Sequence, residues 1–208
     1  MIFACVNTKG GVGKTTTAVH LAVMLANDGT TLLIDGDQQQ SSASWAAWRR
    51  ETDLSPSPTT TCLTGKAILS EGNQLAKNFK HVVVDAGGRD SYGLRSALLL
   101  AQRAVIPIGA SNLDAASMTD LLEVVELARD YNQNLDVRVL LTRVDPRTKD
   151  ATEMLGFLAE QKLRVLNTQV CERVAYRRAV GEGATVSEHG RDLAAIAEMQ
   201  AFFREVME

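Results

Sequence analysis

The stretch NTKGGVGKTTT at residues 7–17 constrains the fold of this 208-residue chain more than any other feature. It follows a short apolar run at 2–6 and opens a segment of helical periodicity at 14–26. Glycines at such a junction let the backbone turn tightly, so that its N–H groups point at phosphate oxygens in front of a helix. The stretch therefore predicts a strand, a phosphate-binding loop and a helix in that order, and hence an α/β fold.

The rest of the chain repeats this alternation of short apolar runs and longer helical segments. The apolar runs predict strands at 2–6, 31–34, 82–84, 105–108 and 137–141, with a weaker strand at 164–170. The helical segments lie at 14–26, 41–50, 66–78, 91–102, 113–131 and 151–161, with a last helix from about 187 to 206. Continuous apolar strands between helices are typical of a mostly parallel, twisted sheet with helices on both faces. We expect one α/β domain, residues 1–208, in which 53–61 forms a loop.

The charge and the cysteines argue against several classes of protein. The formal net charge is −3, whereas proteins that coat DNA are more often basic, so any contact with nucleic acid must be local. Cys5, Cys62 and Cys171 lie far apart, with no CxxC pair for zinc, an iron–sulfur cluster or redox exchange. The apolar run at the N-terminus is far too short for a signal peptide or a membrane span. We therefore expect a cytoplasmic protein.

The loop itself carries the residue types that nucleotide binding requires. The ε-ammonium of Lys14 would reach the β- and γ-phosphates, and the Thr15 hydroxyl is placed to ligate magnesium. A glycine-rich turn that binds nothing is the weaker alternative, because the loop has the strand before it and the helix after it that the motif needs. The predicted nucleotide-binding residues of the loop are Gly10, Gly11, Val12, Gly13, Lys14, Thr15 and Thr16.

A second lysine precedes the glycines. The common phosphate-loop pattern begins with glycine where this chain has Thr8, and Lys9 follows. The pattern KGGVGKTT resembles the deviant Walker A motif of the ParA/MinD family of ATPases. This resemblance implies a P-loop NTPase domain that binds ATP or ADP with Mg²⁺. It also implies that Lys9 acts in trans, touching the phosphates of the other subunit in a nucleotide-sandwich dimer during hydrolysis. The alternative is an ordinary surface lysine near the loop.

Two acids follow the second strand in LLIDGDQQQSS. Asp35 and Asp37 leave the carboxyl edge of the predicted sheet, where open α/β folds bind their ligands. The segment is similar to the family element DxDPQ, with Gln38 in place of the proline. The resemblance implies that Asp37 positions or activates the attacking water beside the metal, and that Asp35 helps near the magnesium or the lysines. Two solvated turn aspartates are the alternative.

A third acid ends the strand of HVVVDAGG. Asp85 matches the Walker B aspartate, which holds magnesium through water. With it, the residues expected at the metal are Thr15, Asp37 and Asp85. Two later strand ends, VIPIGASNLDAASM and LLTRVDP, are similar to family segments near the nucleotide. They imply roles for Pro107, Thr142 and Arg143, although ordinary strand exits would look the same.

Basic residues gather in the last third of the chain. The segment 168–188, TQVCERVAYRRAVGEGATVSE, is similar to a ParA-specific pattern, here Arg173, Tyr176, Gly183, Val186 and Glu188. Between residues 162 and 178 five basic residues stand against Glu172, and such a positive patch could hold DNA phosphates without reading bases, or it could be a solvated helix face with internal ion pairs. The candidate DNA contacts are Lys162, Arg164, Arg173, Arg177 and Arg178.

The tail RDLAAIAEMQAFFREVME separates two branches of the family. MinD-like proteins end in a basic helix that binds anionic membrane, whereas this tail is net negative and would be repelled. Its apolar residues recur at three- and four-residue steps, which favours packing on the domain. Because the first predicted strand begins at residue 2, we expect no N-terminal helix-turn-helix region, and the chain resembles small ParA-type partition proteins.

The resemblance implies an ATPase, weak without its partner, that partitions plasmid or chromosomal DNA. In this interpretation ATP closes a homodimer, with higher-order assemblies a further option. The dimer holds non-specific DNA in the nucleoid, and a ParB-type centromere-binding adaptor stimulates hydrolysis. One alternative is a ParA-like positioner of a non-DNA cargo, and another is a MinD-like membrane-associated regulator. A metabolic or cluster-assembly ATPase is a further class, which the missing CxxC disfavours.

Overall fold

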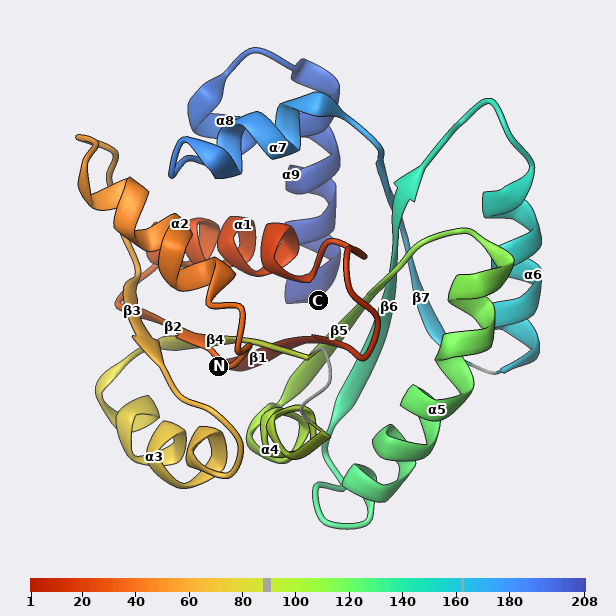
Figure 1. Ribbon diagram of the computed structural model, residues 1–208, viewed down its shortest axis with the longest axis horizontal. Coiled ribbons are helices and arrows are strands. Elements are labelled where there is room, and N and C mark those ends of the chain that lie inside the picture. The colour runs from red at the N-terminus through yellow and green to blue at the C-terminus, as the bar shows by residue number, and fades with distance from the viewer. Residues whose placement is uncertain (88–90, 162) are drawn as a thin grey trace.

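A computed structural model describes residues 1–87, 91–161 and 163–208, and its strands form one seven-stranded sheet in which every pairing is parallel (Figure 1). The strand order is β3-β2-β4-β1-β5-β6-β7. The strands are β1 Ile2–Asn7, β2 Thr31–Asp35, β3 Thr59–Cys62, β4 His81–Gly87, β5 Arg103–Ile108, β6 Asp136–Val144 and β7 Arg164–Cys171. The α/β, parallel-sheet prediction is therefore confirmed.

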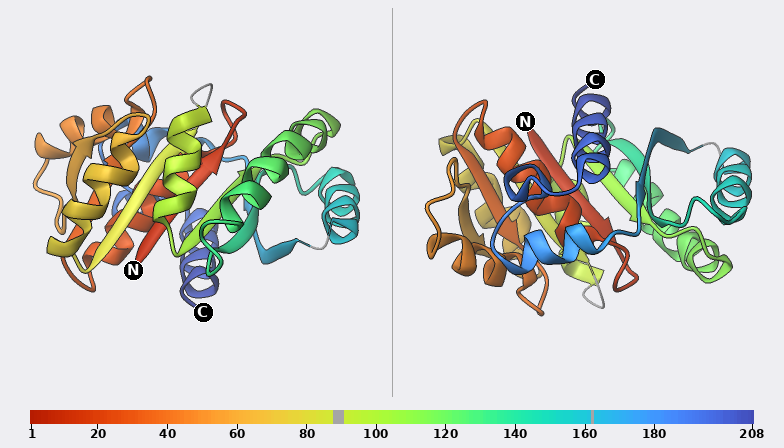
Figure 2. Two further views of the ribbon diagram at one scale, coloured as in Figure 1. Left: turned by 90° about the horizontal axis from the view of Figure 1, so that it is seen from below. Right: turned by 90° about the horizontal axis from the view of Figure 1, so that it is seen from above.

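Helices cover both faces of the sheet, as Figures 1 and 2 show. One face carries α1 (Lys14–Ala26), α2 (Ser41–Arg50), α7 (Val174–Gly181), α8 (Val186–His189) and α9 (Leu193–Met207). The other face carries α3 (Ala67–Leu75) with the 3₁₀ turn η1 (Ala76–Asn78), α4 (Ser91–Leu100), α5 (Asn112–Arg129) and α6 (Asp150–Glu160). No helix within the described residues is both long enough and apolar enough to span a membrane.

Each face has its own hydrophobic core, and β1 shows why the strands are continuously apolar. Phe3 and Cys5 pack into the cluster under α1 and α9, whereas Ala4 and Val6 pack into the cluster under α4 and α5. Successive side chains of a strand point to opposite faces, so a strand covered by helices on both faces has no solvent-facing side and is mostly apolar.

Two elements and one helix break were not predicted. β3 lies within and just beyond the predicted loop at 53–61; its edge position leaves its side chains exposed or half-buried, so it lacks an apolar run. α7 was not predicted either. The single helix predicted from about 187 to 206 is wrong, because the chain forms α8 and α9 with Gly190 between them at φ 71. A left-handed residue of this kind ends a helix.

Parallel topology brings the functional strand ends together. The carboxyl ends of β1, β2, β4, β5 and β6 meet at one edge of the sheet, where β1 lies between β4 and β5. Within this edge Asp85 of β4 stands in register with Cys5 of β1 on one side and Asp35 of β2 on the other. Ligands of open α/β sheets bind at such an edge, beside the point where the strand order reverses.

Candidate nucleotide-binding site

The glycine loop joins β1 to α1 in the geometry that its sequence predicts. Gly11 and Gly13 have φ values of 75° and 88°, a left-handed conformation that other residues adopt only with strain. Gly13 is the residue before α1, and its carbonyl accepts a hydrogen bond from Thr17 N. The first turn of the helix leaves backbone N–H groups without helical acceptors, so the loop and the helix start together have the geometry that anion binding requires.

Lys14 is buried at the base of this loop. Its Nζ donates to the carbonyl of Lys9 at 3.0 Å. Its aliphatic part packs on Gly87 of β4 so closely that a Cβ at this glycine would lie 2.7 Å from Lys14 Cε and 2.3 Å from Asn7 O. The predicted phosphate-binding lysine therefore lies between β1 and β4, with its ammonium directed at the loop.

Asp85 is the centre of the candidate metal site. Its Oδ2 accepts hydrogen bonds from Thr15 Oγ1 at 2.7 Å and from Ser42 Oγ at 2.6 Å. Its Oδ1 is buried and has no hydrogen-bond partner among the described residues. Burial raises the pKa of Asp85 to about 6, although both hydroxyls and the charge of Lys14 act in the opposite direction.

This donor set fits magnesium. Mg²⁺ prefers oxygen ligands and is held in nucleotide sites by a hydroxyl, one or two carboxylates and phosphate oxygens. The buried carboxylate oxygen, which has no partner within the part of the chain that the structure describes, lies beside a threonine hydroxyl in the first turn of α1 and provides such a place. Thr15 and Asp85 thus come together as predicted from the sequence.

The two acids at the end of β2, Asp35 and Asp37, have different surroundings. Asp35 is buried, and its two oxygens accept hydrogen bonds from Ala43 N at 2.7 Å and Asp37 N at 3.1 Å. Burial raises the pKa of Asp35, against these hydrogen bonds. Asp37 is half-buried and accepts a hydrogen bond from Gln39 N at 3.0 Å, in the turn that leads into α2. Asp35 therefore holds the start of α2, and the role of Asp37 in hydrolysis stays a prediction.

Lys9 is held within its own chain. Its Nζ forms an ion pair of 2.6 Å with Asp114 Oδ1, and Asp114 also makes a capping box with Ser111 at the start of α5. Burial alone would raise the pKa of Asp114, but the hydrogen bonds from Lys9 and Ser111 lower it. Lys9 and Asp114 both line a hollow of about 350 Å³ beside the loop.

Asn7 ties the base of the loop to β5. Its side-chain oxygen accepts a hydrogen bond from Lys9 N at 2.9 Å, and its Nδ2 donates to Pro107 O at 2.7 Å. Pro107 itself lies inside β5. Its predicted contact with the nucleotide stays untested.

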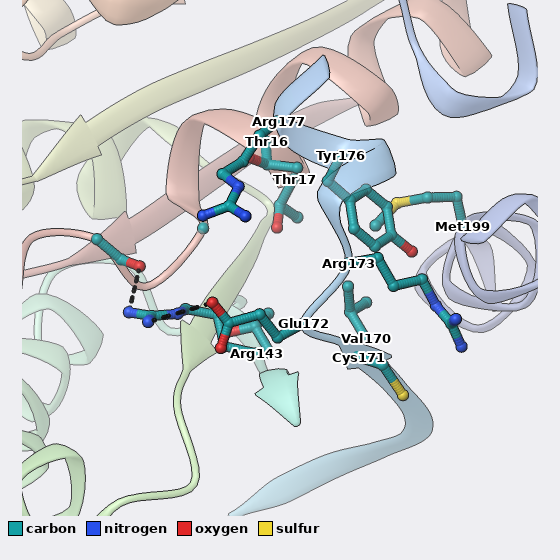
Figure 3. A pocket seen from close by; sticks show the side chains of 13 residues that line it. Thr16, Thr17, Arg143, Val170, Cys171, Glu172, Arg173, Tyr176, Arg177 and Met199 are labelled. Atoms are coloured by element: carbon teal, nitrogen blue, oxygen red, sulfur yellow. Dashed lines mark hydrogen bonds and ion pairs between the residues drawn. The ribbon is translucent and has the colours of Figure 1, made fainter. Parts of the chain in front are cut away.

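A pocket of about 220 Å³ opens on the other side of the loop, between β6 and α7 (Figure 3). The predicted residues Thr142 and Arg143 line it. Thr142 Oγ1 lies 2.8 Å from Val12 O, and Arg143 Nη1 donates to Gly11 O at 3.3 Å. The pocket is therefore continuous with the phosphate loop, as a site for the base and sugar of a nucleotide requires. Its lining is Gly11, Gly13, Thr16, Thr17, Thr142, Arg143, Val170, Cys171, Glu172, Arg173, Tyr176, Arg177 and Met199.

Sequence reasoning missed two residues that shape the site. Ser42 was not singled out, although a hydroxyl in the first turn of a helix that follows two acids is a recognisable signal. Glu198 of α9 accepts hydrogen bonds from Tyr176 Oη at 2.7 Å, Arg173 Nη2 at 2.8 Å and Cys171 N at 3.2 Å, so it fixes one wall of the pocket. Its only signal was an acid on the apolar face of the last helix.

The predicted basic set does not form one patch. Arg164 begins β7 and Arg173 follows its end, so the length of the strand, about 23 Å at the usual rise per residue, separates them. Arg173 is paired with Glu198 at 2.8 Å. Arg177 and Arg178 are exposed on α7, and Arg177 also lines the pocket. Lys162 lies outside the described residues.

Comparison with known proteins gives a consistent result. A family model described as "CobQ/CobB/MinD/ParA nucleotide binding domain" matches residues 3–186. "Maintenance of carboxysome distribution protein A" of Gloeobacter kilaueensis is 33% identical, covering 100% of this chain and 92% of the relative. "Chromosome-partitioning ATPase Soj" of Thermus thermophilus is 29% identical, covering 89% and 87%. The structure of apo McdA from Cyanothece, 18% identical, has a TM-score of 0.80 and covers 100% of this chain and 99% of that one.

Proposed function

This chain belongs to the CobQ/CobB/MinD/ParA family of nucleotide-binding domains, and from that premise we propose that it is a Mg²⁺-dependent ATPase that positions a protein cargo. The observation that carries the ATPase proposal is that Thr15 Oγ1 donates to Asp85, whose buried second oxygen has no partner within the described residues, while the neighbouring Lys14 directs its ammonium at the phosphate loop. A generic glycine turn would not need this arrangement.

Each residue of the site has a defined task in ATP hydrolysis. The loop N–H groups and Lys14 bind the β- and γ-phosphates, and the pocket at Thr142 and Arg143 takes the nucleoside. Thr15 and Asp85 would hold magnesium, which would supply positive charge to the phosphates during phosphoryl transfer. Asp37 orients the attacking water, and its half-buried carboxylate keeps access to solvent.

The proposed switch is a homodimer. Lys9 is one-third exposed and borders an open hollow, so it can exchange its ion pair with Asp114 for the phosphates of a second subunit. An ammonium supplied in this way would stabilise the transition state only when two subunits meet. Hydrolysis then depends on assembly, which a cargo adaptor can stimulate.

A protein assembly is the cargo that we favour. The relative that matches the whole chain at 33% identity is named for the maintenance of carboxysome distribution. We propose non-specific DNA as the surface on which the dimer works, contacted by the exposed Arg177 and Arg178. A membrane surface is disfavoured, because Met199, Phe202 and Val206 of α9 are buried against the sheet.

DNA as cargo is the second candidate, supported by the chromosome-partitioning relative at 29% identity. Deletion of the gene in its own host separates the two. For a protein cargo, fluorescence microscopy would show a protein assembly that clusters, while plasmid and chromosome loss rates stay at the parental level. Raised loss rates with an undisturbed distribution of protein assemblies would favour the DNA cargo.

The proposal that the dimer works on non-specific DNA is tested by sedimentation with ATP, ADP or no nucleotide. The protein is mixed with either random-sequence DNA or anionic liposomes. We expect ATP to promote co-sedimentation with DNA and not with liposomes. Replacing Arg177 and Arg178 by alanine should abolish the DNA response, whereas replacing Arg164 should not. Recruitment to liposomes with DNA left untouched would overturn the proposed surface.

A further inference from the structure

Helix α2 begins at the candidate metal site. Ser42 in its first turn donates to Asp85 Oδ2 at 2.6 Å. The next backbone N–H, of Ala43, donates to Asp35 Oδ2 at 2.7 Å. Both acids of neighbouring strands β2 and β4 are therefore fastened to one helical turn.

The far end of α2 is fastened to the segment between α7 and α8. Arg49 is buried, and its guanidinium donates to Gly183 O at 3.0 Å and to both oxygens of Glu188, at 2.6 and 3.0 Å. Trp45 Nε1 donates to Ala184 O at 3.2 Å. Gly183 touches the helix backbone so closely that a Cβ there would lie 2.3 Å from Arg49 N. The backbones of α2 and of the α7–α8 segment are therefore in direct contact at Gly183.

Glu188 connects α2 to α8. Besides binding Arg49, its Oε2 accepts hydrogen bonds from Thr185 N at 2.8 Å and Thr185 Oγ1 at 2.9 Å, which close the capping box of α8. One carboxylate thus joins α8 to α2. Ser42 and Arg49 are seven residues apart, about 10 Å along the helix axis, so a continuous helix transmits a displacement between them.

We propose that Glu188 is a positioning residue for the metal site, acting through Arg49 and helix α2 to fix Ser42 and hence the Asp85 carboxylate. The connection works in both directions. Binding of magnesium nucleotide at Asp85 sets the position of the α7–α8 surface, which carries Arg177 and Arg178. The inference rests on the proposed ATPase function and adds its means of regulation.

The chain contains its own reporter for this connection. Its two tryptophans, Trp45 and Trp48, both lie on α2. Trp45 is fully buried beside the Arg49 guanidinium, whereas Trp48 is 44% exposed. In a Trp48→Phe background, the fluorescence of Trp45 reports the environment of α2 without any need for hydrolysis.

The experiment titrates Mg²⁺ into this protein saturated with ADP and follows Trp45 fluorescence. Glu188→Gln and Arg49→Lys should each weaken the apparent Mg²⁺ affinity about tenfold, the usual effect of losing a group that orients a metal ligand. Affinity for ADP without Mg²⁺ depends on the phosphate loop and should change less than twofold. Matched controls are Arg50→Lys, at the exposed neighbour on α2, and Glu71→Gln, at an exposed acid of α3.

A double-mutant cycle excludes a merely structural effect. Ser42→Ala leaves the contacts of Glu188 intact and should give the same loss of Mg²⁺ affinity, and adding Glu188→Gln should cause little further loss because both act on one carboxylate. Circular dichroism checks that each variant is folded. A folded Glu188→Gln protein with wild-type Mg²⁺ affinity, or additive losses in the cycle, would overturn the inference. Absence of ADP binding in the parent protein would instead overturn the proposed ATPase function.

Discussion

His20 connects the phosphate-binding helix to the C-terminal part of the fold. Its Nε2 accepts a hydrogen bond from Val186 N at 3.0 Å, so its Nδ1 carries the proton and donates to Thr16 O at 2.7 Å. The ring also packs edge-on against Tyr176, with centroids 5.8 Å apart. The imidazole is therefore neutral in the fold, and its burial lowers the pKa of His20 from 6.5 to about 4.

This lowered pKa predicts a loss of stability in mild acid. The unfolded chain binds a proton at His20 below pH 6.5, and the folded chain does so only near pH 4. The contribution of neutral His20 to the free energy of unfolding is therefore complete above pH 6.5. It falls by about 3 kcal/mol as the pH drops to 4. Chemical denaturation of wild type and His20→Gln across this range measures the difference in slope. Parallel curves for the two proteins would contradict the assignment.

A second prediction concerns Gly87, where an added side chain would clash with its neighbours. Gly87→Ala would drive its methyl group into Asn7 O and the Lys14 side chain. We expect a loss of about 2 kcal/mol of stability, typical of overpacking, and at least a tenfold loss of nucleotide affinity as Lys14 is displaced. Urea denaturation and nucleotide titration measure the two effects. Gly156→Ala is the control, because nothing lies within 4 Å of its added methyl and alanine favours the helix α6. Equal effects of the two substitutions would refute this prediction.

Site residues inside one short motif were accessible from the sequence. Gly13, Lys14 and Thr15 lie together because their spacing dictates the loop, and Asp85 follows from a buried strand that ends in an acid. The pairing of Lys9 with Asp114 was not accessible, since it joins residues 105 positions apart. No local pattern specifies which distant side chains the topology will bring to one edge.

At the scale of elements, two arginines of the sheet, Arg103 and Arg138, hold the C-terminal end of α9; we call this pair the arginine clamp. Arg103 of β5 and Arg138 of β6 donate to the backbone carbonyls of Val206 and Glu205 in the last turn of this helix. Cations at a helix C-terminus also favour its dipole. Asp136 pairs with both guanidiniums, at 2.8 and 2.9 Å, and thereby compensates their charge at the amino edge of the sheet.

Asp136→Asn should therefore loosen the last helix. Two buried guanidiniums would keep their positive charge without this carboxylate, at a cost of about 3 kcal/mol. The measurement is the free energy of unfolding in urea, with limited proteolysis to detect release of α9. Asp53→Asn in an exposed loop is the matched control and should change stability by less than about 0.5 kcal/mol. If the Asp136→Asn protein kept wild-type stability and α9 still resisted proteolysis, Asp136 would not be needed for the clamp.

Element boundaries were predictable where burial was strong. The bounds of α1 and α2 agree with the prediction because polar turns flank both segments. β3 was missed because an edge strand with sequence TTTC has no buried run, and α7 was missed because its short segment VAYRRAVG contains three β-branched or aromatic residues and two arginines. Tertiary contacts with α1, α2 and α8 determine that it is helical.

At the scale of the whole molecule, parallel pairing explains why one edge holds all the chemistry. Every strand ends at the same side, so the loop after β1 meets acids from β2 and β4 and the pocket from β6. The alternation of strands and helices was enough to predict that these site residues lie at one edge of the sheet. The lateral strand order is set by long-range packing, and the sequence pattern does not contain it.

The final prediction concerns assembly. With MgATP, Asp37→Ala should accumulate a dimer of about twice the 22.5 kDa chain mass, because it binds ATP but does not orient the attacking water. Lys9→Ala should bind nucleotide as a monomer within about twofold of wild type, since Lys14 alone serves its own loop, yet lose concentration-dependent hydrolysis by about 10³-fold as for a finger supplied in trans. Light scattering and turnover at increasing protein concentration measure both. Normal turnover by Lys9→Ala would assign this lysine to its ion pair with Asp114 alone.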